Sequence, residues 1–526
     1  MPKVLISDKL SETAVNIFKN RGIETIFSPD LGKDPAALLE AVKDVDGLAI
    51  RSATKVTSDV LAAAENLKVV GRAGIGVDNV DIPTATARGV VVMNTPFGNA
   101  ITTAEHAIAL MFALARQIPQ ANESTHAGRW EKSKFMGTEL FGKTLGVIGC
   151  GNIGANVAER ALGLKMRVVA YDPFLSEPRA VELGVEKVDL ETLLAGADVI
   201  TLHTPLTDQT KNILSKEALS KTKKGVLIIN CARGGLIDED ALFDALKAGH
   251  LGGAALDVYE EEPAKSHKLF GTPNVVATPH LGASTREAQE NVAIQVAEQM
   301  SEYLLKGAVT NALNMASISA EEAPRLRPFI KLAEYLGAFV GQLTETSVQA
   351  IEVTYAGAVA KLNPRPMTAS AIAGVLRPML GDVNIVNAPV IAKERGVAIA
   401  ETFQDSAKNF ESVIRLRIVS ERSERIVAGA LFGSIPRIVE IDGVEMEAAI
   451  APRMLFVNND DKPGFIGALG GTLGDKGVNI ATFNLGRSSR GADAIALLAV
   501  DDAIDDAVIA DVRSLPHVKR AKSLSF

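Results

Sequence analysis

The sequence predicts a multidomain α/β protein in which two parallel-sheet units come first and a small βαββαβ unit comes last. With 526 residues, the chain is long enough for three or four domains of about 150 residues each. Short β-branched runs alternate with helical segments through the first half, which is typical of parallel sheets with right-handed crossovers. The residues after Pro452 follow the order strand, helix, strand, strand, helix, strand.

The composition is globular and acidic. Hydrophobic residues make up 47% and charged residues 22%, which excludes a disordered chain. The net charge of −8 argues against nucleic acid or an anionic membrane as a partner, so an anionic substrate needs local cations.

The cysteine count and the absence of targeting signals favour a cytoplasmic protein. Cys150 and Cys231 are the only cysteines, so we expect no disulfide framework, and we predict no metal site. The N-terminus reads as a strand rather than a signal peptide. The sequence contains no run of 18 apolar residues, so we expect no membrane span.

The first unit is expected to hold five strands, with amphipathic segments such as Glu12–Asn20 and Pro35–Val42 between them. The predicted strands are Val4–Ser7, Thr25–Phe27, Gly47–Ile50, Val69–Gly71 and Val90–Met93.

A long helix should follow the first unit. Thr102 and Glu105 fit a capping box, which places the start of the helix near Thr102. Pro119 should end or kink the helix. Apolar residues recur at helical spacing, at Ala104, Ile108, Met111, Phe112 and Ala115.

The second unit has six candidate strands. The helical pattern of Ser284–Leu305 follows them and is expected to cross back and pack on the first unit. The six strands are Leu145–Gly149, Arg167–Tyr171, Val199–His203, Val226–Asn230, Ala254–Val258 and Val275–Thr278.

A linker at Ala308–Pro324 precedes a third region, 316–450, with mixed helix and strand signals and no catalytic cluster. The last unit is expected to contain the strands Met454–Val457, Asn479–Arg487, Ala494–Val500 and Val518–Ser523 and the helices Gly464–Lys476 and Ile504–Ser514.

A glycine loop in the second unit predicts a dinucleotide site. Gly149, Gly151 and Gly154 match G-x-G-x-x-G between an apolar strand and a helix, and Asn152 and Ile153 complete the loop. The helix N-terminus can then bind the phosphates.

Asp172 closes the next strand, where a carboxylate can bind the adenosine ribose and repel a 2′-phosphate. No arginine follows directly, so NAD is favoured over NADP. The bland alternative is a glycine turn followed by a capping aspartate, but the combination of strand, glycine loop, helix and acid favours the nucleotide site.

Three polar residues near strand ends predict acid–base chemistry. His280 can exchange a proton near neutral pH, Glu262 can raise the pKa of that histidine, and Arg233 can bind a carboxylate with two bonds. Carboxyl ends of parallel strands meet at one sheet edge, so the three can converge there. Each also has a structural alternative: a satisfied histidine, a loop charge, or a solvated acidic turn. Spacing alone does not decide between these.

Several motifs together resemble the D-isomer-specific 2-hydroxyacid dehydrogenase family, and within it the long type with intervening and ACT regulatory domains. The resemblance covers most of residues 1–315 and extends into the C-terminal regions. The motifs are Gly71–Asp81, Asn94-Thr95-Pro96, Gly149–Gly154, Asn230–Gly235, Ala255–Val258 and Thr278–Ala283.

This resemblance implies NAD-dependent oxidation of 3-phosphoglycerate to 3-phosphohydroxypyruvate, the first step of serine biosynthesis. It implies that His280 is the acid/base, Glu262 its partner and Arg233 the carboxylate ligand. Further cofactor contacts implied are Thr204, Cys231, Ala232, Arg233, Asp257, His280 and Ala283.

The substrate contacts that the resemblance implies include cations suited to a carboxylate and a phosphate. They are Arg51, Ser52, Arg72, Gly74 and Asn99, besides Arg233. For Arg51 and Arg72, the alternative is a salt bridge at the domain edge. A basic cluster, Arg129, Lys132 and Lys134, either reaches a neighbouring subunit's site or is a solvated loop.

The C-terminal unit resembles an ACT domain, a small-molecule sensor. Related enzymes bind L-serine there, at positions that match Asn459, Asp461 and Asn479. Plain turn residues are the alternative for the last two. Residues 316–450 resemble the intervening domain, with Asn387-Ala388-Pro389 as the most recognisable stretch.

The resemblance implies a Rossmann-type nucleotide domain, 99–283, inserted in a flavodoxin-like substrate domain, 1–98 and 284–315. An α+β intervening domain at 316–450 and an ACT domain at 452–526 follow. Hinges are expected near Thr95–Asn99 and Leu281–Ser284. A homotetramer is expected.

Two rival functions remain at this stage. One is another D-2-hydroxyacid dehydrogenase, which would reduce 2-oxoglutarate, hydroxypyruvate or glyoxylate. The other is a non-catalytic NAD-sensing interaction protein on the same fold. The C-terminal sensor favours the biosynthetic enzyme.

Overall fold

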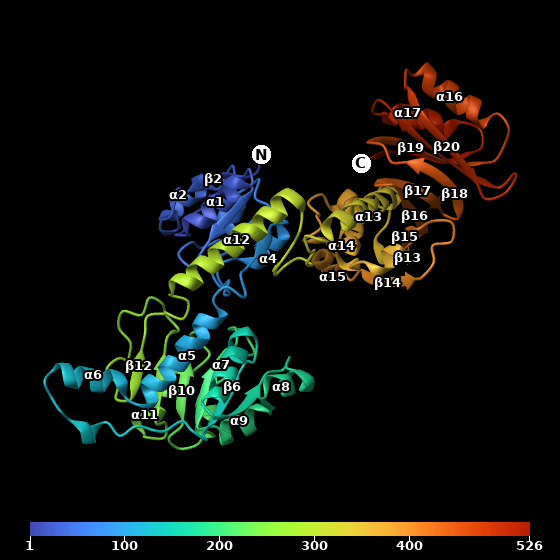
Figure 1. Cartoon of the computed structure of the whole chain (residues 1–526). Coiled ribbons are helices and arrows are strands. Elements are labelled where there is room, and N and C mark those ends of the chain that lie inside the picture. Colours follow the sequence, from blue (N-terminus) through green and yellow to red (C-terminus); the bar gives the residue numbers. More distant parts are fainter.

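The chain folds around four β-sheets, of five, seven, six and four strands. This computed structural model describes all 526 residues. Figure 1 shows an elongated molecule with the second sheet at one end, the fourth at the other, and the first and third between them.

The first sheet is parallel, and its strand order is β2-β1-β3-β4-β5, the flavodoxin-like order. Its strands are β1 (Lys3–Ile6), β2 (Glu24–Phe27), β3 (Gly47–Ile50), β4 (Val69–Arg72) and β5 (Val91–Met93). Its helices are α1 (Glu12–Asn20), η1 (Leu31–Lys33), α2 (Pro35–Ala41), α3 (Ser58–Ala63) and α4 (Ile82–Ala87). All five predicted strands are present.

The second sheet is also parallel, in the order β12-β11-β10-β9-β6-β7-β8. The order reverses between β9 and β6, and ligands bind at such switch points. Its strands are β6 (Thr144–Ile148), β7 (Arg167–Tyr171), β8 (Glu186–Lys187), β9 (Val199–Leu202), β10 (Leu227–Asn230), β11 (Gly253–Leu256) and β12 (Val275–Ala277). The prediction of six strands missed β8, because two exposed, charged residues give no apolar signal.

Helices cover the second sheet and connect it to the first. They are α5 (Ala100–Ala115), α6 (Ile118–His126), η2 (Lys132–Lys134), α7 (Asn152–Gly163), α8 (Glu177–Leu183), α9 (Leu190–Gly196), α10 (Lys216–Ser220), α11 (Glu239–Lys247) and α12 (Arg286–Lys306). The long helix α12 packs on α1, and Met300 fills the space that Gly71 of β4 leaves open. The expected return of this helix to the first unit is therefore observed.

The predicted capping box at Thr102 is wrong. Helix α5 already begins at Ala100 after Asn99, so Thr102 lies within the helix and Glu105 pairs with Arg160 at 3.4 Å instead. Pro119 lies in the first turn of α6, where its missing N–H costs no hydrogen bond. The helix before it ends at Ala115.

The third sheet has the order β14-β13-β15-β16-β17-β18. Its strands are β13 (Val348–Gly357), β14 (Ala398–Gln404), β15 (Ser412–Ser420), β16 (Glu424–Phe432), β17 (Ile435–Ile441) and β18 (Val444–Ala449). Its helices are α13 (Ala323–Leu343), η3 (Ala358–Lys361), α14 (Pro364–Leu380) and α15 (Ala388–Glu394). Helices α13 and α14 approach closely at Gly374, where a methyl group would lie 2.7 Å from the Ala338 nitrogen.

The fourth sheet is antiparallel, in the order β20-β21-β19-β22, and has the predicted βαββαβ sequence of elements. They are β19 (Arg453–Asp460), α16 (Phe465–Asp475), β20 (Ile480–Arg487), β21 (Asp493–Val500), α17 (Asp506–Ser514) and β22 (Val518–Ser525). Phe456 of β19 packs on Phe339 of α13, with ring centroids 6.0 Å apart.

The buried cores show which parts form continuous packing. One apolar cluster runs from the first sheet through α12 and the third sheet to the fourth. The second sheet has two clusters of its own. The second unit is therefore joined to the rest mainly through α5 and α12, an arrangement that permits hinge motion. No helix is both long and apolar enough to cross a membrane.

Candidate active site

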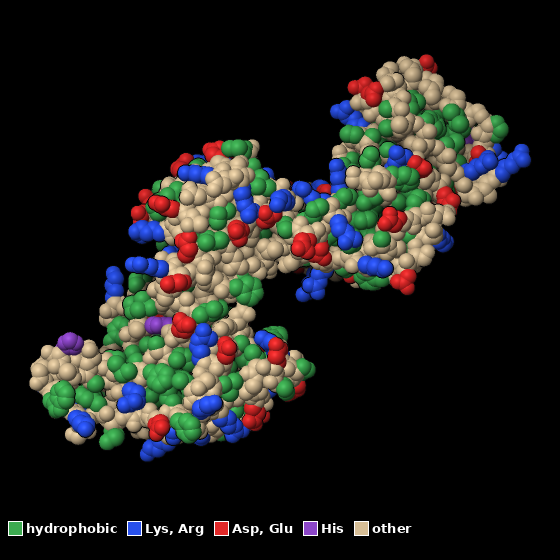
Figure 2. Space-filling model, viewed as in Figure 1, with side chains coloured by type: hydrophobic (Ala, Val, Ile, Leu, Met, Phe, Trp, Pro, Cys, Tyr) green, Lys and Arg blue, Asp and Glu red, His purple; other side chains and the backbone are tan.

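A cavity of about 830 Å³ lies between the first and second units. Both units contribute to its wall, so closure of one unit on the other would change its shape. The first unit and the residue before α5 contribute Arg51, Ser52, Arg72, Gly74 and Asn99. The second unit contributes Tyr259, Glu262, Phe270, Thr278, His280 and Ala283. Elsewhere, the face in Figure 2 carries side chains of both charges interspersed.

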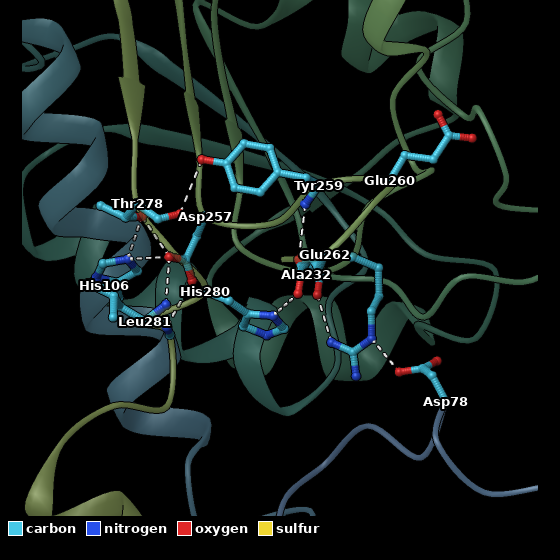
Figure 3. A network of polar contacts seen from close by, with 12 residues as sticks. Asp78, His106, Ala232, Asp257, Tyr259, Glu260, Glu262, Thr278, His280 and Leu281 are labelled. Carbon is cyan, nitrogen blue, oxygen red and sulfur yellow. Dashed lines mark hydrogen bonds and ion pairs between the residues drawn. The ribbon is translucent and has the colours of Figure 1, made fainter. Parts of the chain in front are cut away.

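His280 and Glu262 form a hydrogen-bonded pair in this cavity, as Figure 3 shows. Nδ1 of His280 lies 2.7 Å from Oε2 of Glu262, and the other carboxylate oxygen accepts the N–H of Tyr259 at 3.1 Å. Burial raises the pKa of Glu262, but the hydrogen bond and charge of His280 outweigh it, so the net pKa is lowered. An ionised carboxylate thus orients the imidazole and leaves Nε2 for other partners.

The loop after His280 is held by Asp257, whose side chain is fully buried. Its Oδ1 accepts the Thr278 hydroxyl at 2.6 Å and the Leu281 amide at 2.7 Å, and its Oδ2 accepts the Gly282 amide at 2.8 Å. Burial raises the pKa of Asp257, but the hydrogen bonds from His106 and its other partners outweigh it and lower the pKa. Figure 3 shows His106 of α5 beside this carboxylate.

Arg233 extends from the end of β10 toward the first unit. Its Nε donates to Oδ2 of Asp78 at 2.8 Å, and Nη1 donates to the Ala232 carbonyl at 2.7 Å. Asn230 fixes the loop, because its amide donates to the Arg233 carbonyl and its Oδ1 accepts the Ala232 N–H. Gly76 lacks the side chain that would collide with the guanidinium.

Arg51 and Arg72 bring positive charge to the cavity wall. Arg233 does not line the cavity, but its charge lies close enough to act on Arg72. Burial, and then the nearby charges of Arg233 and Arg51, lower the pKa of Arg72 to about 10. The Nε of Arg72 is buried without a hydrogen-bond partner. Arg72 as a whole is partly buried, Nη1 donates to the Ala73 carbonyl at 3.4 Å, and no carboxylate pairs with it. A cation that is partly removed from water without an anionic partner is unfavourable, so this end of the cavity suits an anionic group.

The glycine loop leaves room for a dinucleotide at the switch point of the second sheet. Gly149 has φ of +89°, and a methyl group at Gly151 would meet nothing within 4 Å. At Gly154 a methyl group would collide with the Gly149 carbonyl, so α7 packs closely on the loop. Asp172 lies beside the loop, where Oδ2 accepts the Cys150 N–H at 2.8 Å. These residues fit NAD.

Neither cysteine is a nucleophile candidate. Burial, with a smaller effect of Asp172, raises the pKa of Cys150 to about 11, and burial also raises the pKa of Cys231. Both thiols therefore stay protonated near neutral pH and serve as small apolar groups in a core cluster of the second unit.

Other predicted residues lie where they could contact the cofactor or an effector. Thr204 packs its methyl group against the Gly149 position, and Cys231 and Ala232 are buried in the loop before Arg233. Ile153 is partly buried in α7, and Asn152 reaches the Pro96 carbonyl at 3.4 Å. In the basic cluster, Arg129 and Lys134 both pair with Glu131. Neither these two residues nor Lys132 lines the cavity.

The three effector candidates share no direct hydrogen bond with one another. Asn459 is buried, and its Oδ1 has no partner. Asp461 pairs with Arg487 at 2.9 Å and accepts the Gly491 N–H at 3.0 Å. Asn479 donates to Asp501 at 2.5 Å.

Sequence reasoning assigned no role to several residues of the site. Asp78 lies within a quoted motif, yet only the fold shows that it meets Arg233. His106, Thr278, Tyr259 and Phe270 carry no local pattern that separates them from core residues. Their contribution depends on how α5 and β12 lie in space.

Three family models match successive parts of the chain. A family model described as "D-isomer specific 2-hydroxyacid dehydrogenase, NAD binding domain" matches residues 108–282. The "D-3-phosphoglycerate dehydrogenase intervening domain" matches 325–442, and "ACT domain" matches 453–517.

Relatives align end to end. The chain is 42% identical to D-3-phosphoglycerate dehydrogenase of Bacillus subtilis (strain 168) over 530 residues, covering 100% of both chains. It is 42% identical to the Methanocaldococcus jannaschii enzyme of the same name over 521 residues, covering 99% of both. A crystal structure of TT0316 protein from Thermus thermophilus matches with a TM-score of 0.55 and 36% identity, covering 59% of this chain and 99% of that one.

Proposed function

The chain belongs to the D-3-phosphoglycerate dehydrogenases of the D-isomer-specific 2-hydroxyacid dehydrogenase family, and from this membership we infer which of its residues perform the reaction. The protein oxidises 3-phospho-D-glycerate to 3-phosphohydroxypyruvate with NAD⁺, the first step of L-serine biosynthesis. The hydrogen-bonded pair of His280 and Glu262 in a cationic cavity carries the assignment of roles.

His280 is the acid/base. In oxidation, its Nε2 takes the proton of the substrate's C2 hydroxyl as the carbonyl forms, and in reduction it returns that proton. The Glu262 carboxylate stabilises the protonated imidazole and fixes the tautomer through Nδ1. Bound NAD⁺ supplies the acceptor for the hydride from C2.

Arg233 binds the substrate carboxylate. Asp78 and the Ala232 carbonyl hold its guanidinium through Nε and one Nη1 hydrogen, which leaves the second Nη1 hydrogen and both Nη2 hydrogens for the substrate. A planar fork sets the angle of the bound carboxylate, and so the position of C2 relative to His280.

Arg51, Ser52 and Arg72 receive the phosphate, with Gly74 and Asn99 completing that end. The substrate has two anionic ends, and Arg233 is committed to one of them. Arg72, whose Nε is buried without a hydrogen-bond partner and which pairs with no carboxylate, supports a second anion subsite. Asn99 adds a buried Oδ1 without a partner in the same wall.

NAD binds across the second unit. The loop of Gly149, Gly151, Asn152, Ile153 and Gly154 binds the pyrophosphate, and Asp172 binds the adenosine ribose. The remaining cofactor contacts are Thr204, Cys231, Ala232, Arg233, Asp257, His280 and Ala283. The room at Gly151 and the position of Asp172 beside the loop support this placement.

Regulation and assembly complete the proposal. L-Serine binds the ACT domain at Asn459, Asp461 and Asn479, and the enzyme is a cytoplasmic homotetramer. Residues 1–98 and 284–315 act as substrate domain, 99–283 as nucleotide domain, 316–450 as intervening domain and 452–526 as ACT domain. Separate apolar cores in the second unit support a nucleotide domain that moves against the rest.

Initial rates of NADH consumption test the substrate assignment. We expect kcat/KM for 3-phosphohydroxypyruvate to exceed that for hydroxypyruvate at least about 100-fold, because Arg51 and Arg72 are left without an anion when the phosphate is missing. Equal values, or a higher value for 2-oxoglutarate, would overturn the assignment of the phosphate subsite.

A further inference from the structure

The turn Arg51–Thr54 follows β3, the middle strand of the first sheet. Arg51 and Ser52 line the cavity, and Ser52 and Ala53 are exposed. The next residue, Thr54, is fully buried. The turn thus runs from the sheet into the cavity and back into the core within four residues.

Asp8 holds the turn from the side of β1. Its carboxylate follows the end of that strand and is 3% exposed. Oδ2 accepts the backbone N–H of Arg51 at 2.6 Å and that of Thr54 at 3.2 Å. A buried carboxylate is costly unless it is hydrogen-bonded, so these two amides also stabilise Asp8 where it lies.

Asn79 holds the same two residues from the side of β4. Its Nδ2 donates to the carbonyl of Arg51 at 2.7 Å and to that of Thr54 at 2.6 Å. The loops that follow the two strands flanking β3 therefore supply one acceptor for both amides and one donor for both carbonyls. The Ser7 hydroxyl, 2.8 Å from the Thr54 hydroxyl, adds a third contact.

We propose that Asp8 and Asn79 are positioning residues that hold the Arg51–Thr54 turn in the shape that binds the substrate's phosphate. The inference rests on the proposed function of the cavity. The four backbone groups at the ends of the turn are bonded to the two side chains, whereas the Ser52 and Ala53 amides make no hydrogen bond within the chain. Those two amides, the Ser52 hydroxyl and the Arg51 guanidinium are then available to one tetrahedral anion.

This arrangement makes the preference for phosphate depend on residues that never touch it. A preorganised turn binds without the cost of ordering its backbone at the moment of binding. When Asp8 or Asn79 is removed, the turn must be ordered by the ligand, and affinity for the phosphorylated substrate falls. Chemistry at C2 depends on His280 in the other unit and should change little.

Steady-state kinetics of Asp8→Ala and Asn79→Ala test the proposal with two substrates that differ only in the phosphate. For 3-phosphohydroxypyruvate, we expect KM to rise about tenfold or more in each variant, with kcat within about threefold of the native value. For hydroxypyruvate, kcat/KM should stay within about threefold. Asp8→Asn keeps an acceptor oxygen and should restore most of the native KM.

Asp46→Ala is the matched control. Asp46 lies at the opposite end of β3, where Oδ2 accepts the Lys3 N–H at 2.8 Å and Oδ1 accepts Lys68 Nζ at 2.8 Å. This variant should lower the thermal unfolding temperature without changing the ratio of kcat/KM values for the two substrates. Thermal unfolding of the Asp8 and Asn79 variants shows whether the native fold persists.

The possible results distinguish the proposed phosphate subsite from the positioning role of Asp8 and Asn79. A native enzyme that does not prefer 3-phosphohydroxypyruvate would overturn the proposed phosphate subsite. With that preference intact, equal losses on both substrates, or an unchanged KM in folded Asp8→Ala and Asn79→Ala, would overturn the positioning role alone.

Discussion

Arg233 and Asp78 meet across the cleft, with the arginine Nε 2.8 Å from the aspartate Oδ2. The arginine belongs to the second unit and the aspartate to the first, so the pair couples the position of the substrate-binding guanidinium to the closure of the cleft. Asp78 is two-thirds exposed, so the pair contributes little to stability. The effect of the Arg233–Asp78 pair is to orient the guanidinium.

Arg233→Lys should lower kcat/KM for 3-phosphohydroxypyruvate about 10- to 100-fold, because lysine keeps the charge but lacks the planar fork. Initial rates of NADH consumption measure the effect. Arg167→Lys is the control, since Arg167 is a surface residue paired with Glu186, and it should leave kcat/KM unchanged. A native rate in Arg233→Lys would remove the bidentate role.

Glu262→Gln should shift the pH dependence of turnover. The pKa of Glu262 is lowered, so the native carboxylate stays ionised through neutral and mildly acidic pH and stabilises the protonated His280. The amide lacks this charge. Native turnover should therefore fall only at acidic pH, where Glu262 takes up a proton, whereas Glu262→Gln should be about tenfold or more slower at every pH and should lack this acid limb.

The profile of kcat/KM against pH, measured in both directions, checks this prediction. Both directions should slow, because both need the imidazole that the Glu262 carboxylate orients. Glu261→Gln changes an exposed neighbour and should leave the native profile unchanged. A native profile in Glu262→Gln would contradict the proposed pairing.

Asp172→Ala should weaken the preference for NAD over NADP. The carboxylate lies beside the glycine loop and would repel a 2′-phosphate. The ratio of kcat/KM for NADH to that for NADPH should fall about tenfold or more. Because Asp172 also accepts the Cys150 N–H, Asp172→Asn separates the loss of charge from the loss of this bond. A native ratio in both variants would exclude the ribose contact.

Asp461→Ala should blunt inhibition by L-serine while leaving the rate without serine unchanged. The native carboxylate pairs with Arg487, and an ammonium group would have to replace or join that pair. Serine titrations of the initial rate measure the effect, with the exposed Asp475→Ala as control. Inhibition that survives in Asp461→Ala would remove this residue from the effector site.

Strands of the two parallel sheets could be predicted closely, because buried parallel strands are continuous apolar runs bounded by glycine or polar residues. Gly47–Ile50 and Arg167–Tyr171 are observed with the predicted ends. The strand Glu186–Lys187 escaped prediction because its residues are charged and exposed. The capping-box pattern gave the wrong start for helix α5, because the chain already becomes helical at Ala100, before Thr102.

The sequence predicted which residue types perform the chemistry of the site, but not how those residues are arranged in space. Residue types and motifs nominated Arg233, Glu262 and His280, but spacing could not show that the last two lie in contact. Supporting residues such as Asp8 and Asn79 were beyond sequence reasoning. Their role appears only when β1 and β4 flank β3, which is a property of strand order.

The most direct test of the account is turnover and NADH binding in His280→Ala. We expect reduction of 3-phosphohydroxypyruvate to fall by a factor on the order of 100 to 10,000, because the proton donor is lost. NADH affinity, measured by fluorescence titration, should remain within about threefold, because the dinucleotide binds mainly through the glycine loop. Near-native turnover in a folded His280→Ala enzyme would contradict the role of His280, and loss of NADH binding together with turnover would show that the residue acts on the cofactor site instead.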